Sequence, residues 1–416
     1  MSPAPPLADP RTQPTKPSRR LPQGFAFTGS TTAFVSLYLA AGAPTPLLTY
    51  YQQQWGFAAP LLTLAFAVYS GGFLIALLTA GSLSDHIGRR PVLLGALFVQ
   101  LVSMIMFLTA ADIGAVIAAR VVQGVATGAA TSAFSAALVE LAPPGRKKLA
   151  TVLSSVGVAG GLALGALLAG LAIEYVPRPD VPVFIALAAI TVFGMMIVAL
   201  APDGGIRRKG ALRSLLPKIT VPAAARSEFL SAAPAIAAGW MLAALSLGLA
   251  PSIVRHVFQI DSGLLTGFTV FVGPAASAVA GLAFLRVGSR SGMVLGIAAS
   301  IAGTAGIVSG VLTGSLLLLV AGQVLGGIGF GAAFAAALRL IMPLVAAHER
   351  GSVAAAVYIL AYASFSIPVI LAGLLAPSFG LVAAVVVYGI VIVLLSVTSL
   401  FRQIGTQRSL NSLGAA

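Results

Sequence analysis

Cysteine is absent from this 416-residue sequence, and charged residues make up only 8% of it. Without cysteine the chain forms no disulfide and offers no thiol for catalysis or metal binding. A soluble globular protein carries about 25% charged residues, whereas 58% of this chain is hydrophobic and its mean hydropathy is +1.03. The composition therefore excludes a soluble domain and indicates an all-α integral membrane protein, because an open sheet would leave backbone polar groups unpaired in lipid.

Long apolar runs recur along the whole sequence. Each run of about 18 residues or more can cross a bilayer core of about 30 Å, and we predict twelve such transmembrane helices. The predicted spans are residues 27–50, 60–80, 92–111, 114–139, 149–173, 182–201, 231–251, 263–284, 292–313, 315–341, 352–375 and 379–401.

The longest connection divides six predicted spans from six. We therefore predict two six-helix bundles, called below the first half and the second half. The predicted segments are a cytoplasmic tail (1–25), the first bundle (26–201), a cytoplasmic linker (202–230), the second bundle (231–402) and a second tail (403–416).

Acidic residues are also scarce, with 10 Asp and Glu against 24 Lys and Arg. A net charge of +14 suits nucleic acid, but the basic residues lie in short loops between apolar runs, so membrane orientation explains them better. With both termini in the cytoplasm, every Lys and Arg except Arg120, Arg178 and Arg255 falls on the inner side. Because inner loops carry the positive charge, we predict this topology, in a bacterial inner membrane, with the lipid bilayer as partner and no nucleic acid.

The two halves show an internal repeat at a shift of 200 residues. Gly81, Gly88 and Arg90 then fall on Gly281, Gly288 and Arg290, and Gln123 falls on Gln323. Two matches in one register indicate a duplicated unit, which is typical of transporters built from related halves.

The turn between the second and third spans reads G-x-x-x-D-x-x-G-R-R, from Gly81 through Asp85, Gly88 and Arg89 to Arg90. It resembles the loop at the same place in the major facilitator superfamily. The resemblance implies that this turn, with Glu140 and Arg146 at the inner end of span four, forms a cytoplasmic gate. We expect Asp85 to meet the start of span eleven, at Gly351 and Ser352, where a helix N-terminus is electropositive.

Arg120 lies within span four, where an arginine costs about 2.5 kcal/mol or more, so it should face the protein interior rather than lipid. A side chain snorkelling to the surface is the alternative. Arg120, Gln123 and Gly124 resemble the family's fourth-helix motif R-x-x-Q-G, which implies a place in the central cavity and a link to proton coupling.

Gly157, Gly161 and Gly165 give span five a flat face, which favours close helix packing. They also resemble the fifth-helix motif of the drug:proton antiporters, although Leu162 stands in place of its proline. In span one, Pro44 and Pro46 should kink or end the helix. We interpret the nearby Tyr50, Tyr51 and Trp55 as an aromatic belt at the membrane interface, and not as substrate contacts.

The family's arrangement implies that spans one, four, seven and ten line the transport path. The substrate-contact candidates on these spans and on span eleven are Tyr38, Trp240, Gln323, Tyr358 and Tyr362, for each of which packing remains the alternative. No acidic residue lies in the middle of a span, so a proton acceptor would have to be Asp112, Glu140, Glu228 or the substrate.

These observations predict a secondary transporter that exports a small organic solute or drug by proton antiport. The alternative is a facilitator or symporter taking up a small metabolite such as a sugar or organic anion. A membrane enzyme is disfavoured, because the sequence has no HExxH motif and no paired carboxylates at depth. We expect no cofactor, no metal and no nucleotide-binding P-loop, and we expect a monomer with a small-molecule substrate and protons as partners.

Overall fold

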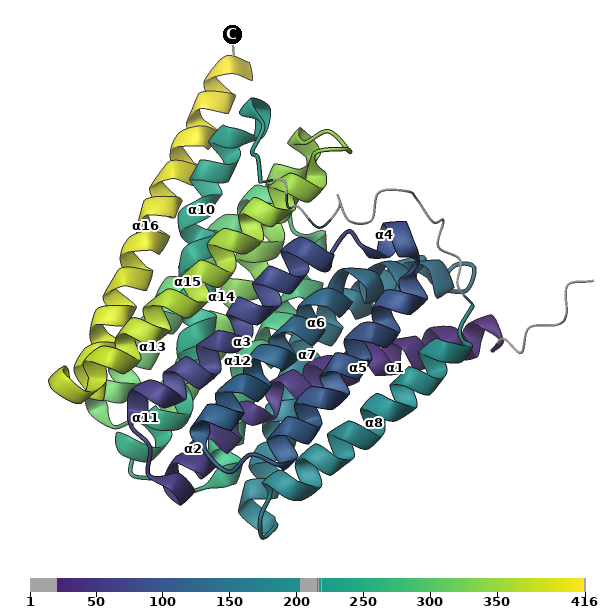
Figure 1. The fold of residues 1–416 in the computed structure, drawn as a ribbon. Helices are drawn as coiled ribbons and strands as arrows, with labels where there is room; N and C mark the ends of the chain where they lie inside the picture. The colour runs from purple at the N-terminus through teal and green to yellow at the C-terminus, as the bar shows by residue number, and fades with distance from the viewer. Residues whose placement is uncertain (1–20, 203–214, 216, 218, 415–416) are drawn as a thin grey trace, which may run out of the picture.

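The computed structural model of the chain describes residues 21–202, 215, 217 and 219–414. In these residues every regular element is a helix, and twelve helices or helix pairs are long and apolar enough to cross a membrane (Figure 1). The predicted fold class is therefore confirmed. The spans are α1 with α2 (Gln23–Gly42, Pro44–Trp55), α3 (Ala59–Ala80), α5 (Arg89–Leu108), α6 (Ile113–Leu141), α7 (Lys147–Tyr175), α8 (Asp180–Leu200), α10 with α11 (Ala223–Ala244, Ala250–His256), α12 (Gly263–Ala283), α13 (Ser289–Thr313), α14 (Leu316–Ile341), α15 (Arg350–Phe379) and α16 (Leu381–Gly414).

The span boundaries differ from the predicted ones mainly at the ends of the chain. The first span begins at Gln23, four residues before the predicted start at residue 27. The last helix, α16, runs to Gly414, so the segment from residue 403 is a helical continuation and not a separate tail. Most of the predicted first tail and part of the predicted linker, including Arg207, Arg208 and Lys209, lie outside the described residues.

The two ends of the helix bundle differ in charge. We call the basic end the one at which α3 joins α5 through the short helix α4 (Ser84–Ile87), and the far end the one at which α2 and α11 lie (Figure 1). Arg89, Arg146 and Arg350 lie at the basic end, whereas Arg178 and Arg255 lie at the far end.

The first span is broken at Ala43, between α1 and α2. Pro44 and Pro46 have no N–H, so they cannot donate to the carbonyl groups of Ala40 and Gly42 four residues earlier. The helix therefore ends at these prolines, which is one of the two predicted outcomes. This break leaves backbone acceptors in the middle of a buried span, and these acceptors need donors from other helices.

The seventh span contains a π-helical segment, η1 (Leu245–Leu249), between α10 and α11. The backbone N–H of Ala250 donates to Leu245, five residues back, which is the π-helical pattern. Pro251 follows in the first turn of α11 and again removes a donor. Both halves thus begin with a span whose regular hydrogen bonding is interrupted.

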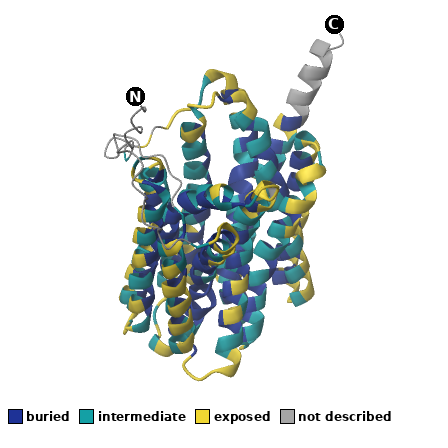
Figure 2. Cartoon of the chain, turned by 90° about the vertical axis from the view of Figure 1, so that its right-hand side faces the viewer, coloured by how far each residue is buried: buried dark blue, intermediate teal, exposed yellow. Residues whose placement is uncertain are grey.

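Buried residues lie along the inside of the bundle, and exposed ones lie on its outer surface and at its ends (Figure 2). Towards the far end, one apolar cluster contains residues of both halves, and the rings of Phe66 and Phe365 meet there at 5.2 Å. Towards the basic end, the buried residues form two clusters, one drawn only from the first half and one only from the second. The halves are therefore joined at the far end and separate at the basic end.

Two further contacts between the halves close the far end. Gly170 of α7 faces Gly267 of α12 so closely that a Cβ at position 170 would lie 2.7 Å from the Cα of Gly267. The Glu174 carboxylate accepts hydrogen bonds from the Ser262 hydroxyl at 3.0 Å and the Leu264 backbone N–H at 3.2 Å. This carboxylate of the first half therefore occupies the N-terminus of a second-half helix, where a negative charge is favoured.

The close approach of α7 and α12 predicts that Gly170→Leu opens the far end. Overpacking costs about 1–3 kcal/mol, equivalent to roughly tenfold in the ratio of closed to open protein. A cysteine in place of Thr63, which is buried against Gly373 of the other half, serves as the reporter. We expect a soluble maleimide to label this cysteine about tenfold faster in the Gly170→Leu protein.

The matched control is Gly95→Leu, because a Cβ at Gly95 meets nothing within 4 Å. It should leave labelling at position 63 unchanged. Equal labelling in the Gly170→Leu and Gly95→Leu proteins would show that the α7–α12 contact does not close the far end.

Candidate functional site

Arg120 of α6 is buried inside the protein, with 2% of its surface exposed. Its Nη1 donates to the carbonyl oxygen of Ala41 at 3.1 Å, and its Nε donates to that of Ala65 at 3.3 Å. The guanidinium carbon lies 4.4 Å from the centre of the Tyr69 ring, within the range of a cation–π interaction. The side chain therefore points between helices and does not snorkel towards lipid.

Gln123, one turn further along α6, completes this arrangement. Its Oε1 accepts a hydrogen bond from Arg120 Nη1, and its Nε2 donates to the carbonyl oxygen of Ala40 at 2.7 Å. Ala40 carries the carbonyl that Pro44 leaves without a helical donor. Gln123 thus satisfies the carbonyl group that Pro44 leaves without a helical donor, and Arg120 bonds to the neighbouring carbonyl of Ala41.

No carboxylate neutralises Arg120 in the described part of the chain. The ion pairs found there involve other residues and lie near the helix ends. The described acidic residues themselves lie in loops or in the terminal turns of helices, apart from Glu228 in the second turn of α10. The centre of the protein therefore holds one buried positive charge compensated only by dipoles, which favours an anion nearby.

Aromatic side chains connect this charge to the second half. Phe73 lies beside Tyr69 at 6.2 Å between ring centres and stacks on Tyr362 of α15 at 4.7 Å. The ring of Tyr362 in turn lies 4.7 Å from that of Trp240 in α10. The contacts between rings therefore cross from α3 to the second half without interruption.

Four of the five predicted substrate-contact residues lie close together where these ring contacts pass between the two halves. Trp240 and Tyr362 touch, Tyr358 lies 6.4 Å from Tyr362, and Tyr38 is close enough to both tyrosines for electrostatic interaction. Trp240 also packs edge-on against Phe330 and Phe334 of α14, two residues that the sequence analysis did not select. The sequence offered no signal for them beyond their place on span ten.

Gln323, the fifth candidate, lies elsewhere. It precedes Phe330 by seven residues on α14, which is about 10 Å along a helix. Its side chain is 1% exposed, and neither amide atom has a hydrogen-bond partner in the structure. The structure therefore does not bring Gln323 into the aromatic group around Trp240.

The internal repeat explains the position of Gln323. Glycines of α6 pack against backbone carbonyls of α3, and glycines of α14 pack in the same way against α12. The corresponding contacts are Gly124 on Tyr69, Gly128 on Phe73, Gly327 on Gly273 and Gly331 on Ser277. The shift is therefore 203 residues for α6 and α14, and 204 for α3 and α12.

The predicted register of 200 residues is thus wrong for these helices. The equivalent of Gln323 is Arg120 and not Gln123, and Gly281 does not correspond to Gly81. The register holds only for α5 and α13, where Ser103 and Gly303 face Ala119 and Gly322 of the next span. The shift between the halves changes after α5 and α13, because α13 has 25 residues and α5 has 20.

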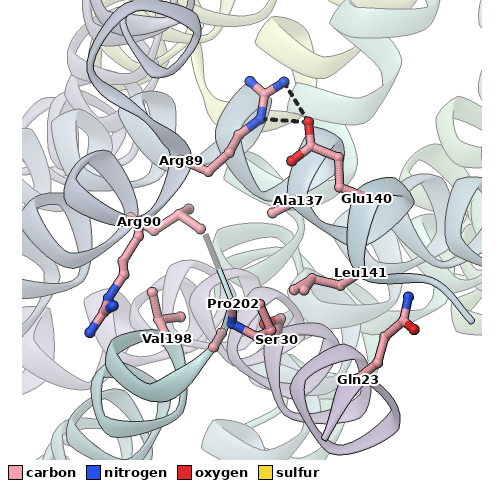
Figure 3. A pocket seen from close by; sticks show the side chains of 11 residues that line it. Gln23, Ser30, Arg89, Arg90, Ala137, Glu140, Leu141, Val198 and Pro202 are labelled. Carbon is pink, nitrogen blue, oxygen red and sulfur yellow. Dashed lines mark hydrogen bonds and ion pairs between the residues drawn. The ribbon is translucent and has the colours of Figure 1, made fainter. Parts of the chain in front are cut away.

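The predicted gate residues form a compact charge group at the basic end. Arg89 donates to Asp85 at 2.7 Å and to Glu140 at 3.0 Å. They border a cavity of about 320 Å³ between α1, α5, α6 and α8, with the Arg90 guanidinium turned away from Glu140 (Figure 3). Its lining residues are Gln23, Ser30, Arg89, Arg90, Leu93, Ala137, Glu140, Leu141, Val198, Ala201 and Pro202.

Two expectations about this gate differ from the structure. Arg146 is exposed and takes part in no ion pair among the described residues, so Arg89 is the partner of Glu140. Asp85 forms no hydrogen bond with the start of span eleven among the described residues, and its partner is Arg89. The reason is that the halves are separate at this end, so α4 and the N-terminus of α15 are apart.

The sequence matches the family model of the Major Facilitator Superfamily over residues 31–285. The chain belongs to this superfamily. It is accordingly a secondary transporter with many membrane spans. Among curated protein sequences, none matches the chain.

Two solved structures show the same superfamily fold. The human organic anion transporter MFSD10 (TETRAN) is 17% identical, with a TM-score of 0.64, and the match covers 91% of this chain and 100% of that one. A bacterial homologue of the human lysosomal transporter Spinster, in an inward-facing and unoccupied conformation, is 13% identical with a TM-score of 0.71. That match covers 94% of this chain and 98% of the other.

The glycine face of α7 packs against α1 in this superfamily member. Modelling a Cβ at Gly161 places it 2.7 Å from the Cβ of Tyr38, and one at Gly157 lies 3.1 Å from the Phe34 ring. Gly165 meets the carbonyl oxygen of Leu39. These glycines therefore allow α7 to approach the first span, as the packing interpretation predicts.

The interpretation of Tyr51 as part of an interfacial belt is wrong. Tyr51 is 2% exposed and its ring stacks on that of Trp55 at 4.7 Å. It belongs to the apolar cluster that joins the halves, because it lies on the buried face of α2 with Leu47 and Leu48. Tyr50 is only partly buried.

All three residues named as candidate proton acceptors have structural partners, and that of Glu140 is Arg89. Asp112 caps α6 by accepting from the Ala115 backbone N–H at 2.8 Å. Glu228 of α10 forms two hydrogen bonds with Arg290, at 2.9 and 3.0 Å. Neither carboxylate reaches Arg120, so both have roles at helix ends in this conformation.

The hydrogen bond to Ala40 predicts that Gln123→Leu lowers stability. The change would leave a buried carbonyl group without a donor, at a cost of about 1–3 kcal/mol. Gln100→Leu is a matched control, because Gln100 is fully buried in α5 and its amide has no partner. Thermal unfolding of purified protein should show a lower Tm for Gln123→Leu and an unchanged or higher Tm for Gln100→Leu. Equal losses would contradict the assigned contact.

Proposed function

We propose that this protein moves a small organic anion with an aromatic part across the membrane by alternating access. The observation that carries the proposal is Arg120, a buried charge with no carboxylate partner among the described residues. It is joined through Tyr69, Phe73 and Tyr362 to Trp240 in the other half. An anionic group beside Arg120 and a ring among these aromatic side chains would satisfy both features.

The human organic anion transporter MFSD10 supports this substrate class by its name, at 17% identity. The two halves supply different parts of the site, since the charge belongs to α6 and the indole of Trp240 to α10. A substrate that contacts both halves favours the conformations in which they approach each other, which is the requirement for coupling binding to movement.

We propose that the basic end faces the cytoplasm, with both termini on that side. Arg89, Arg146 and Arg350 lie there, and inner loops of membrane proteins carry an excess of such residues. The structure then corresponds to an inward-facing conformation, closed outside by the contact of α7 with α12. A bacterial inner membrane and a monomeric state remain predictions.

Export by proton antiport is the coupling we favour, on the resemblance of the fourth-helix motif around Arg120. The second candidate is facilitated or symport uptake. It is favoured by the position of the described carboxylates, all of which lie in loops or in the outer turns of helices. In that case an anionic substrate would itself carry the proton.

Transport by protein reconstituted in liposomes tests both proposals. The panel contains aromatic carboxylates and their neutral amides, each with and without an imposed pH gradient. We expect Arg120→Gln to reduce transport of the carboxylates by about 30-fold or more, because losing the partner of a buried charge costs about 2–5 kcal/mol. Arg178→Gln, at the exposed far end, is the control and should transport normally.

Three results would test the anion site and distinguish antiport from facilitation. Transport of the amides at the rate of the carboxylates would exclude an anion site at Arg120. Uptake driven by an opposed pH gradient would support antiport. Uptake of the carboxylates that does not depend on pH would support facilitation.

The separation of Asp85 from α15 predicts that this residue acts in the other conformation. We expect Asp85→Asn to slow transport by about tenfold, since a charge at a helix N-terminus is worth up to about 2 kcal/mol. The amount of protein in the membrane should not change, because Asp85 is 54% exposed here and bonds only to its neighbour Arg89 among the ion pairs found. Normal transport by Asp85→Asn would refute its part in the gate.

A further inference from the structure

A second cavity, of about 620 Å³, lies at the basic end of the second half. It is separate from the aromatic group around Trp240 and from the cavity beside Arg89. Its lining combines two guanidinium groups and one hydroxyl with three apolar side chains, and contains no acid. The lining residues are Ser289, Leu338, Arg339, Met342, Pro343 and Arg350.

Arg339, in the last turn of α14, has an uncompensated charge. Its Nη1 donates to the carbonyl oxygen of Phe284 at 3.1 Å. Its Nε and Nη2 are buried and have no hydrogen-bond partner in the structure. A guanidinium with buried, unpaired donors is costly, and an anion beside it would remove that cost.

The opposite wall of the cavity also favours an anion. Arg350, the first residue of α15, is exposed and uses its Nε for the carbonyl oxygen of Val345 at 3.4 Å. Ser289 begins the 25-residue helix α13, whose N-terminus has no side-chain cap. The free backbone donors of such a helix end add to the positive potential.

Two other arginines at the basic end have carboxylate partners. Arg89 is paired with Asp85 and Glu140, and Arg290 is paired with Glu228. In the described residues neither Arg339 nor Arg350 forms an ion pair, although Glu349 adjoins Arg350 in sequence. The positive charge of this cavity is therefore left for a group from outside the chain.

We propose that this cavity binds a phosphate group. The planar guanidinium groups of Arg339 and Arg350 match the oxygen atoms of phosphate. Leu338, Met342 and Pro343 form an apolar wall beside them, and Leu285 and Leu344 next to the cavity are 56% and 47% exposed. The same chemistry fits the headgroup of an anionic phospholipid at the membrane surface or a phosphate ion from water.

The proposal requires neither a transport substrate nor a coupling ion, so it is independent of the proposed function. Its test measures the Tm of purified, delipidated protein in three mixtures. These are phosphatidylcholine micelles, the same micelles with phosphatidylglycerol, and phosphatidylcholine micelles with inorganic phosphate. The dissociation constant of each ligand follows from the shift in Tm with concentration.

The test compares Arg339→Gln and Arg350→Gln with Arg146→Gln. Arg146 is an exposed arginine at the same end that has no ion pair among the described residues, so it controls for loss of one charge. We expect the first two variants to weaken binding by about tenfold or more, equivalent to about 1.4 kcal/mol. Arg146→Gln should bind like the unchanged protein. Without ligand, Arg339→Gln should not lower the Tm, since it removes an unpaired buried charge.

Each outcome either supports or overturns the proposed phosphate site. Stabilisation by phosphatidylglycerol alone, lost in the Arg339 and Arg350 variants, supports a lipid headgroup site. Stabilisation by inorganic phosphate with the same dependence on the two arginines supports a site filled from water. No stabilisation by either ligand, or an equal loss in Arg146→Gln, would overturn the proposal. If Arg339→Gln fails to fold, Arg350→Gln alone is compared with Arg146→Gln.

Discussion

The guanidinium group of Arg120 is held in an apolar span by backbone carbonyl oxygens and not by a carboxylate. Placing an arginine at the centre of a span costs at least about 2.5–3.5 kcal/mol. Hydrogen bonds to a charged group return about 1.5–3 kcal/mol each, so the carbonyl oxygens of Ala41 and Ala65 can offset the cost. They leave the net charge in place, however, and this charge is what the protein can offer to an anionic substrate.

The arrangement depends on the break in the first span. Pro44 removes the helical donor of Ala40, and Gln123 replaces it while also accepting from Arg120. In the second half, the equivalent of Arg120 is Gln323, and the equivalent of Gln123 is Gly326, which packs against the side chain of Leu242. The duplicated unit has therefore kept a charge in one copy only. In the proposed function, Arg120 of the first half would hold the anionic group and Trp240 of the second half would contribute aromatic surface.

The sequence predicted the features that depend on composition and local pattern. Twelve spans, the superfamily and the helix end before Pro44 follow from hydropathy, from motifs and from the missing N–H of proline, and each is confirmed. The burial of Arg120 follows from the cost of exposing it to lipid. The inward position of Tyr51 did not follow, because it depends on which face of α2 packs against the second half, and sequence spacing does not give that packing.

The equivalence of Arg120 and Gln323 was missed for a related reason. Insertions of a few residues at a helix end leave no mark in an apolar sequence, so a constant shift of 200 residues concealed the longer α13. Contacts between distant helices are equally hidden, since Phe330 and Phe334 are ordinary apolar residues until Trp240 is placed beside them. Local chemistry can be read from residues one helical turn apart, but partners on other spans require the packing.

Opening the basic end and opening the far end would break different interactions. At the basic end, Arg89 bonds to Glu140 and Arg290 to Glu228, and each pair lies within one half. Separating the halves there breaks none of these bonds. At the far end, the Glu174 carboxylate bonds to α12 across the halves, and the close approach of α7 to α12 would be lost with it. Opening the far end therefore breaks contacts between the halves, and in the proposed function the binding of an anion at Arg120 would offset that cost.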